Sequence, residues 1–108
     1  MKTDLKAAWV QALRSGDYAQ GTGQLHDPNR DCHCALGVLG QLLAEDGEAR
    51  WSADGTELFP LHFPFDPDEF ISARLTGLTP EEQGDIVHLN DTQRRSFAEI
   101  ADWIEGAL

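Results

Sequence analysis

The densest group of reactive side chains lies between residues 26 and 34. Its members are His26, Asp31, Cys32, His33 and Cys34. Imidazoles and thiolates suit tetrahedral zinc, so a zinc site is one hypothesis for this segment. The ligands of such a site would be Cys32, Cys34, His26 and one of His33, His62 and His88. Structural zinc sites usually separate paired cysteines by two or more residues, and no second ligand pair of known spacing occurs, so we expect no metal and no cofactor.

Cys34 supports a second hypothesis, a small thiol-dependent enzyme or thiol sensor. A cysteine in the first turn of a helix has its thiolate favoured by the helix dipole. His88, together with Asn90 or Asp91, would then serve as the base and the orienting group. No family-specific pattern surrounds Cys34, however, and a place one turn before Val38 is typical of a small buried apolar residue. We therefore favour a core cysteine and expect no catalytic residue.

The remaining polar candidates have structural explanations. A bridge between Cys32 and Cys34 would be strained, so we expect two free thiols, as in a reducing compartment. His62 lies among prolines and aromatic residues and is expected to pack in a loop. His88 comes late in a predicted helix, where the dipole favours a cation. The pair Asn90-Asp91 is interpreted as a cap and turn that joins the last two helices.

The net charge of -11 is concentrated in the C-terminal part of the chain. Residues 1–44 hold four basic and four acidic side chains, whereas residues 45–108 hold four arginines and fifteen carboxylates. Such a surface repels phosphate backbones, which argues against direct nucleic-acid binding. It either keeps the protein solvated or attracts a basic surface of a partner protein. The carboxylates expected to bind such a partner are Asp66, Asp68, Glu69, Glu81, Glu82 and Asp85.

The N-terminal half is predicted to contain two helices. Apolar residues recur at helical spacing over residues 3–15, with Thr3 as the N-cap and Gly16 as the stop. The same periodicity predicts a helix over residues 32–44, capped by Asp31.

Two glycines interrupt the second predicted helix. Gly37 and Gly40 each cost on the order of 1 kcal/mol of helix stability relative to alanine. We therefore expect another part of the backbone to approach this helix closely.

Three further helices begin with capping sequences. Asp66-Pro67-Asp68-Glu69 and Thr79-Pro80-Glu81-Glu82 each combine an N-cap, a proline at the first helical position and an acidic third residue. Ser96-Phe97-Ala98-Glu99 is a capping box. The predicted helices cover residues 67–75, 80–89 and 97–107.

The other segments predict little regular structure. Residues 17–30 are expected to form a loop or a short irregular hairpin. The Asp54-Gly55 pair predicts a two-stranded hairpin over residues 51–59. The expected fold is mainly α, of the α+β class, a compact bundle of about five helices with a small two-stranded hairpin. Residues 1–108 are expected to form a single domain.

No stretch approaches the ~20 apolar residues that a membrane span requires. No apolar segment follows Met1-Lys2-Thr3-Asp4-Leu5-Lys6, so a secretory signal is not expected and we expect a cytoplasmic protein. The oligomeric state stays open.

Four stretches of the sequence resemble a family of small uncharacterised proteins found in bacteriophages, prophages and bacterial genomes. The stretches are Trp9 with residues 12–21 (ALRSGDYAQG), residues 34–39 (CALGVL), residues 89–91 (LND) and residues 96–105 (SFAEIADWIE). The resemblance spans nearly the full length in the same order. That family often has Cys-Cys before Leu-Gly-Val, whereas this chain has Cys34-Ala35 and so lacks the vicinal thiol pair.

That family has no established activity, so a non-enzymatic accessory role is expected here by analogy with other small phage proteins. Small acidic phage proteins often bind and disable host machinery, and anti-restriction and anti-CRISPR inhibitors are examples. By that analogy, the partner would be a bacterial protein with a basic surface, such as a nucleic-acid-binding defence protein. The thiol-dependent enzyme or sensor centred on Cys34 is the alternative.

Overall fold

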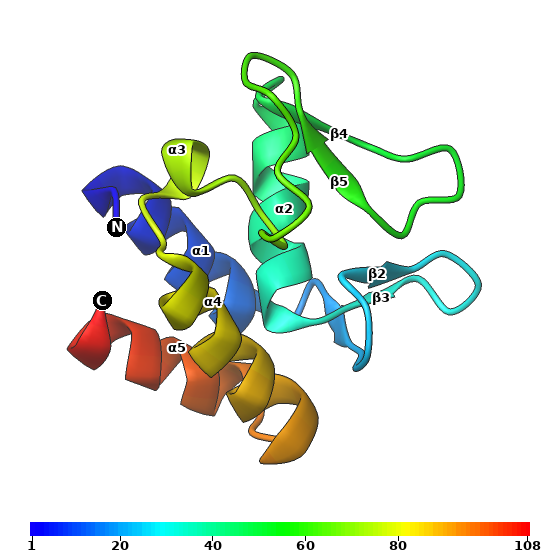
Figure 1. Ribbon diagram of the computed structural model, residues 1–108. Coiled ribbons are helices and arrows are strands. Elements are labelled where there is room, and N and C mark those ends of the chain that lie inside the picture. Colours follow the sequence, from blue (N-terminus) through cyan, green and yellow to red (C-terminus); the bar gives the residue numbers. More distant parts are fainter.

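Helix α2 (Ala35–Glu45) is the central element of the fold. The computed structural model describes residues 1–108 and places helices on one side of α2 and two small sheets on the other (Figure 1). Seven of its eleven residues are buried, which is typical of a helix packed on several sides. The elements that position any site are therefore arranged around α2.

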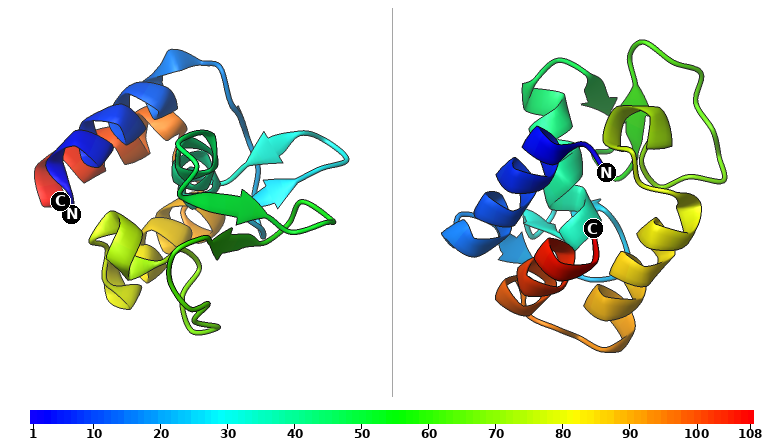
Figure 2. Two further views of the ribbon diagram at one scale, coloured as in Figure 1. Left: turned by 90° about the horizontal axis from the view of Figure 1, so that it is seen from above. Right: turned by 90° about the vertical axis from the view of Figure 1, so that its left-hand side faces the viewer.

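The helical side is formed mainly by α1 (Thr3–Ser15) and α5 (Phe97–Ala107). The two helices lie antiparallel and side by side, so the two chain ends are close together (Figure 2). Trp9 is fully buried, and its indole N–H donates to the carbonyl oxygen of Ala35 over 2.9 Å, which ties α1 to the start of α2. No helix is long and apolar enough to span a membrane.

Three short strands form a sheet beside the start of α2. The central strand, β3 (Cys32–His33), pairs in parallel with β1 (Ala19–Gln20) and antiparallel with β2 (His26–Asp27). In the antiparallel pair, His26 lies directly opposite His33. The expected loop over residues 17–30 therefore contributes two of the strands in this sheet.

A second sheet pairs β4 (Ala49–Trp51) with β5 (Leu58–Pro60) in antiparallel register. The predicted hairpin is present, but it extends over residues 49–60 and not 51–59. Its turn spans residues 52–57. Ser52 N–H donates to Glu57 O over 2.8 Å across that turn.

The chain then passes through α3 (Ala73–Thr76), α4 (Pro80–Val87) and a π-helical turn, η1 (His88–Thr92). The helix starts predicted at Thr79 and Ser96 are confirmed, and both are capping boxes. Thr79 and Ser96 each accept a backbone N–H from the glutamate three residues later, and that glutamate bonds back. Gly16 is also confirmed as the stop of α1, with a left-handed φ of 79°. The predicted N-cap at Thr3 is wrong, because Lys2 takes that position.

The predicted start of α2 is wrong. Asp31 has a φ of 49° and ends the turn between β2 and β3, so it caps no helix. Cys34 takes the N-cap position and makes no side-chain capping bond. The side chain of Asn90 supplies that bond instead, since its Oδ1 accepts the N–H of Ala35 over 3.2 Å.

The helix predicted over residues 67–75 is also wrong, because only α3 is helical in that segment. The N–H groups of Phe70 and Ile71 donate to Oε1 of Gln83, both over 3.1 Å, and not to carbonyls one turn earlier. Asp66 accepts the N–H of Asp68 over 2.9 Å in a local turn. These bonds hold the segment in an irregular path.

Gly37 confirms the expected close approach of backbone to α2. A Cβ placed on Gly37 would lie 1.7 Å from the carbonyl oxygen of Leu25, in the loop that precedes β2. That same oxygen accepts the N–H of Cys34 over 3.2 Å. Gly40 instead faces side chains, those of Leu58 and Trp51.

We expect Gly37→Ala to lower the free energy of unfolding by at least about 2 kcal/mol, because the added methyl group must displace the Leu25 backbone. Gly84→Ala is the matched control, since a Cβ on Gly84 in α4 meets nothing within 4 Å. It should raise stability by about 0.5–1 kcal/mol through helix propensity alone. Urea unfolding followed by circular dichroism measures both. Equal effects of the two substitutions would contradict the close approach.

Candidate functional site

The six carboxylates expected to bind a partner take part in no ion pair. Asp66, Asp68, Glu81 and Asp85 are exposed, and Glu69 and Glu82 are half-buried. The ion pairs of the molecule involve other groups. Arg74, the cation nearest to this segment in the sequence, lies over the ring of Phe63, 5.4 Å from its centroid. Their charge is therefore not neutralised by neighbouring arginines.

The acidic surface does not continue over α5. Arg14 bonds to both Asp102 and Glu105, and these bonds raise the pKa of the guanidinium. Arg95 pairs with Glu99 one helical turn away, over 3.2 Å. All three carboxylates of α5 are thus paired with arginines, whereas the six between residues 66 and 85 are not.

Gln83 joins the two segments that carry these carboxylates. Its buried side chain accepts the N–H of Phe70 and donates to the carbonyl oxygen of Ile71 over 2.8 Å. The end of this loop, at Phe70 and Ile71, therefore lies against α4, which carries Glu81, Glu82 and Asp85.

Three large apolar side chains are exposed in the same loop. Leu61, Phe65 and Phe70 keep 47%, 50% and 52% of their surface in solvent, and they are the large apolar residues most exposed in the molecule. We name the whole region the acidic-aromatic surface. It consists of Leu61, Phe65, Asp66, Asp68, Glu69, Phe70, Glu81, Glu82 and Asp85.

Some of these carboxylates also stabilise the local backbone. Asp66 accepts the N–H of Asp68, Glu69 accepts that of Ala73, and Glu82 accepts that of Thr79. The carboxylates of Asp68, Glu81 and Asp85 accept no hydrogen bond within the protein. Only these three can be changed without loss of a structural contact.

The residues proposed for thiol chemistry have an unsuitable geometry. Cys34 is 6% exposed, and burial raises the pKa of its thiol to about 11. His88 is exposed on η1, and the amide of Asn90 is used in structural bonds. Thiolate formation at neutral pH is therefore disfavoured at Cys34, in contrast to the effect expected from the helix dipole.

Asn90 is a buried structural residue. It is 1% exposed, and its Oδ1 accepts hydrogen bonds from Ala35 N–H and from Gln20 Nε2. Its Nδ2 donates to the carbonyl oxygen of Gly21 over 2.8 Å and to Asp91 over 2.7 Å. The predicted cap between the last two helices is wrong, because Asn90 lies inside η1 and caps the start of α2, 55 residues away.

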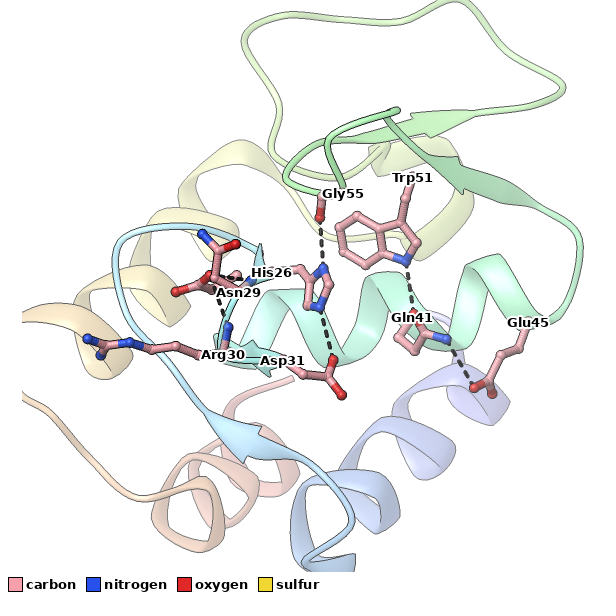
Figure 3. A network of polar contacts seen from close by, with 9 residues as sticks. His26, Asn29, Arg30, Asp31, Gln41, Glu45, Trp51 and Gly55 are labelled. Atoms are coloured by element: carbon pink, nitrogen blue, oxygen red, sulfur yellow. Dashed lines mark hydrogen bonds and ion pairs between the residues drawn. The ribbon is translucent and has the colours of Figure 1, made fainter.

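A second cluster of chemically active side chains lies at the turn between β2 and β3. His26 Nδ1 lies 2.8 Å from the carbonyl oxygen of Gly55, and Nε2 of the same ring lies 3.1 Å from a carboxylate oxygen of Asp31 (Figure 3). The rings of His26 and His33 are stacked with centroids 4.4 Å apart. One ligand atom from each of His26, Asp31 and His33 lies within 4.8 Å of the others.

These side chains line a hollow of about 350 Å³, which we name the histidine pocket. Its wall also includes Tyr18, Glu45 and Trp51. Burial, then the carboxylates of Glu45 and Asp17, raise the pKa of Tyr18. No lysine or arginine lines the pocket, and the labelled Arg30 side chain points away from the His26 ring (Figure 3).

His33 is the unusual member of the pocket. Only 7% of its surface is exposed, and its Nδ1 is buried with no hydrogen-bond partner. Burial, together with the neighbouring His26, lowers the pKa of His33. A buried polar atom without a partner is uncommon in native proteins and calls for an explanation.

The hypothetical zinc set and the observed cluster share only the histidines. Cys34 lies in the core, and Asp31 takes the place that the cysteines were expected to fill. Recognition of a hairpin over residues 26–33 would have placed His26 opposite His33. That hairpin was not predicted because its strands are only two residues long.

Another hollow, of about 720 Å³, runs along α1 beside Glu105 and holds no cluster of reactive side chains.

The chain belongs to the family described as Domain of unknown function (DUF8296), whose sequence model matches residues 1–73. No curated protein and no solved structure matches it. The matched segment contains the whole histidine pocket and the loop of the acidic-aromatic surface, but it ends before α4.

We expect iodoacetamide to leave Cys34 unmodified in the native Cys32→Ser variant. With a pKa of about 11, roughly one thiol in ten thousand is ionised at neutral pH, and burial also blocks the reagent. Mass spectrometry should show full modification once urea is added, which serves as the control. Rapid modification without urea would support the thiol-enzyme alternative.

We expect His33 to make stability depend on pH. The folded protein lowers the pKa of His33, so the unfolded chain binds more protons between that value and about 6.5. The contribution of neutral His33 to the free energy of unfolding is complete above about pH 6.5. It is lost as the pH falls through the pKa of His33 in the folded protein. The difference in free energy of unfolding between the wild type and His33→Asn should thus shrink from about pH 7 to about pH 5, measured by urea unfolding in metal-free buffer.

His62→Asn, which removes an exposed imidazole, controls for the loss of one histidine. A constant difference between the wild type and His33→Asn would contradict a buried neutral His33.

Proposed function

We propose that this protein acts by binding a partner protein with a basic surface, through its acidic-aromatic surface. The observation that carries the proposal is the coincidence of unpaired carboxylates with exposed aromatic rings. Asp68, Glu81 and Asp85 take part in no ion pair, and Phe65 and Phe70, in the same loop as Asp68, are each about half exposed. A charge-only surface would not need the phenylalanines.

The two kinds of side chain contribute differently to association. Carboxylates that face a basic surface speed encounter and exclude acidic partners. Aromatic rings that enter a pocket supply most of the affinity when they are desolvated at the centre of an interface. Phe65 contacts Phe59 edge-to-face with centroids 4.9 Å apart, so one side of its ring is held while the other stays available.

The class of partner follows from the chemistry and from the resemblance to phage proteins. A protein surface that binds nucleic acid presents lysine and arginine to phosphates, and carboxylates can occupy the same cations. We therefore propose a bacterial nucleic-acid-binding protein as the partner and inhibition of its nucleic-acid binding as the result. An anti-CRISPR or anti-restriction role is the most specific form of this proposal.

The test neutralises only carboxylates without a structural bond. The surface variant combines Asp68→Asn, Glu81→Gln and Asp85→Asn. The immobilised wild type is expected to retain a basic protein from a bacterial lysate at low salt and to release it at high salt, because screening weakens exposed charge pairs. The surface variant should retain about tenfold less of that protein, in line with the scale of electrostatic steering. Phe65→Ser with Phe70→Ser should reduce retention at both salt concentrations.

The control variant removes the same number of charges elsewhere, through Asp4→Asn, Asp17→Asn and Glu57→Gln, all at exposed positions without an ion pair. It should retain the partner as the wild type does. Added duplex DNA or RNA should release the partner, because both ligands use the same cations. Equal retention by the surface and control variants would refute the assignment of binding to this surface.

A further inference from the structure

We infer that His26, Asp31 and His33 form a binding site for a divalent first-row transition-metal ion, with Zn²⁺ as the best match. Two imidazoles and one carboxylate are a ligand set that such ions accept, with the remaining positions left to water or a substrate. The site lies outside the acidic-aromatic surface, so it does not depend on the proposed function.

The first argument is the orientation of His26. A carbonyl oxygen has no proton, so the 2.8 Å contact with Gly55 O requires that Nδ1 of His26 carries one. In the neutral ring, Nε2 then has a free lone pair. An N–H bonded to a backbone carbonyl is the usual support of a metal-binding histidine, because it fixes the tautomer and the ring orientation.

The second argument is what that lone pair faces. Nε2 lies 3.1 Å from Oδ1 of Asp31, which is also an acceptor. Two acceptors at this distance repel each other unless a cation lies between them. The cation is either a proton on Nε2 or a metal ion bound by both atoms. Their separation is close to that of two ligands of one metal ion, because ligands at about 2.1 Å from tetrahedral zinc are about 3.4 Å apart.

His33 distinguishes the metal from the proton. A proton on Nε2 would satisfy His26 and Asp31 but would leave the buried Nδ1 of His33 without a partner. A metal ion would also engage His33, because one of its two ring nitrogens lies no more than 4.8 Å from the other two ligand atoms, and an approach of at most about 1.4 Å completes the set. Asp31, whose side chain is 88% exposed, is free to move toward His33.

The surrounding charge favours a cation. The pocket is lined by three carboxylates, those of Asp17, Asp31 and Glu45, and by no lysine or arginine. Because the hollow is open to solvent on one side, it leaves room for water on a bound ion. A bound ion would also connect the two hairpins, because its ligands come from the β2–β3 hairpin and the supporting carbonyl from the β4–β5 turn.

Zn²⁺ titration of the tag-free, chelator-treated protein by calorimetry tests this site. We expect one Zn²⁺ per chain. Asp31→Asn should weaken binding at least about tenfold. This variant should fold as the wild type does, because Asp31 is exposed and asparagine tolerates its φ of 49°. His33→Asn should weaken binding to a similar degree.

A second readout is the fluorescence of Trp51. Its ring lies 5.5 Å from that of His26, so Cu²⁺ or Ni²⁺ in the site should quench it. The quenching should be lost in Trp51→Phe, whereas Zn²⁺ binding by calorimetry is kept.

The controls are His62→Asn, His88→Asn and Cys32→Ser, which remove other potential ligands and should leave Zn²⁺ affinity unchanged. Two results would overturn the assignment. One is a wild type that binds Zn²⁺ no more tightly than Asp31→Asn does, and the other is a site that is lost in any of the three controls. Neither result bears on partner capture, which uses different residues.

Discussion

The buried amide of Asn90 is the interaction on which the rest of the structure depends. It accepts the N–H of Ala35 at the start of α2 and donates to the carbonyl oxygen of Gly21, between the first two strands. Because Asn90 is 1% exposed, its loss would leave these groups buried and unpaired, at a cost of about 1–3 kcal/mol for each. The start of α2, and with it the position of β3, follows from this cap.

The position of β3 gives His33 and Cys34, the two most reactive side chains of this region, opposite environments. His33 is the last residue of β3 and lines the histidine pocket, whereas Cys34 follows it and lies in the core. A side chain that enters an apolar core becomes a poor acid, which accounts for the raised pKa of the thiol. A strand shifted by one residue would exchange these environments, since alternate side chains point to opposite faces.

The distribution of charge shows why a net value says little about a binding surface. The carboxylates of α5 lie near Arg14 and Arg95, so that part of the acidic sequence is neutralised in the fold. The carboxylates between residues 66 and 85 take part in no ion pair, and the loop that holds three of them also holds the exposed rings of Phe65 and Phe70. The proposed interface is therefore smaller than the acidic half of the sequence. It is more selective, because it combines two kinds of contact.

The sequence by itself determined the elements whose stabilising contacts are local. The range of α1, its stop at Gly16 and the capping boxes of Thr79 and Ser96 follow from residues within one turn of each other. Only the tertiary structure decided the start of α2, the irregular path before α3 and the pairing of His26 with His33. In the first two cases a side-chain amide 12 to 55 residues away takes the backbone hydrogen bonds. In the third, strands of two residues are too short for a periodic pattern, so their register depends on packing against α2.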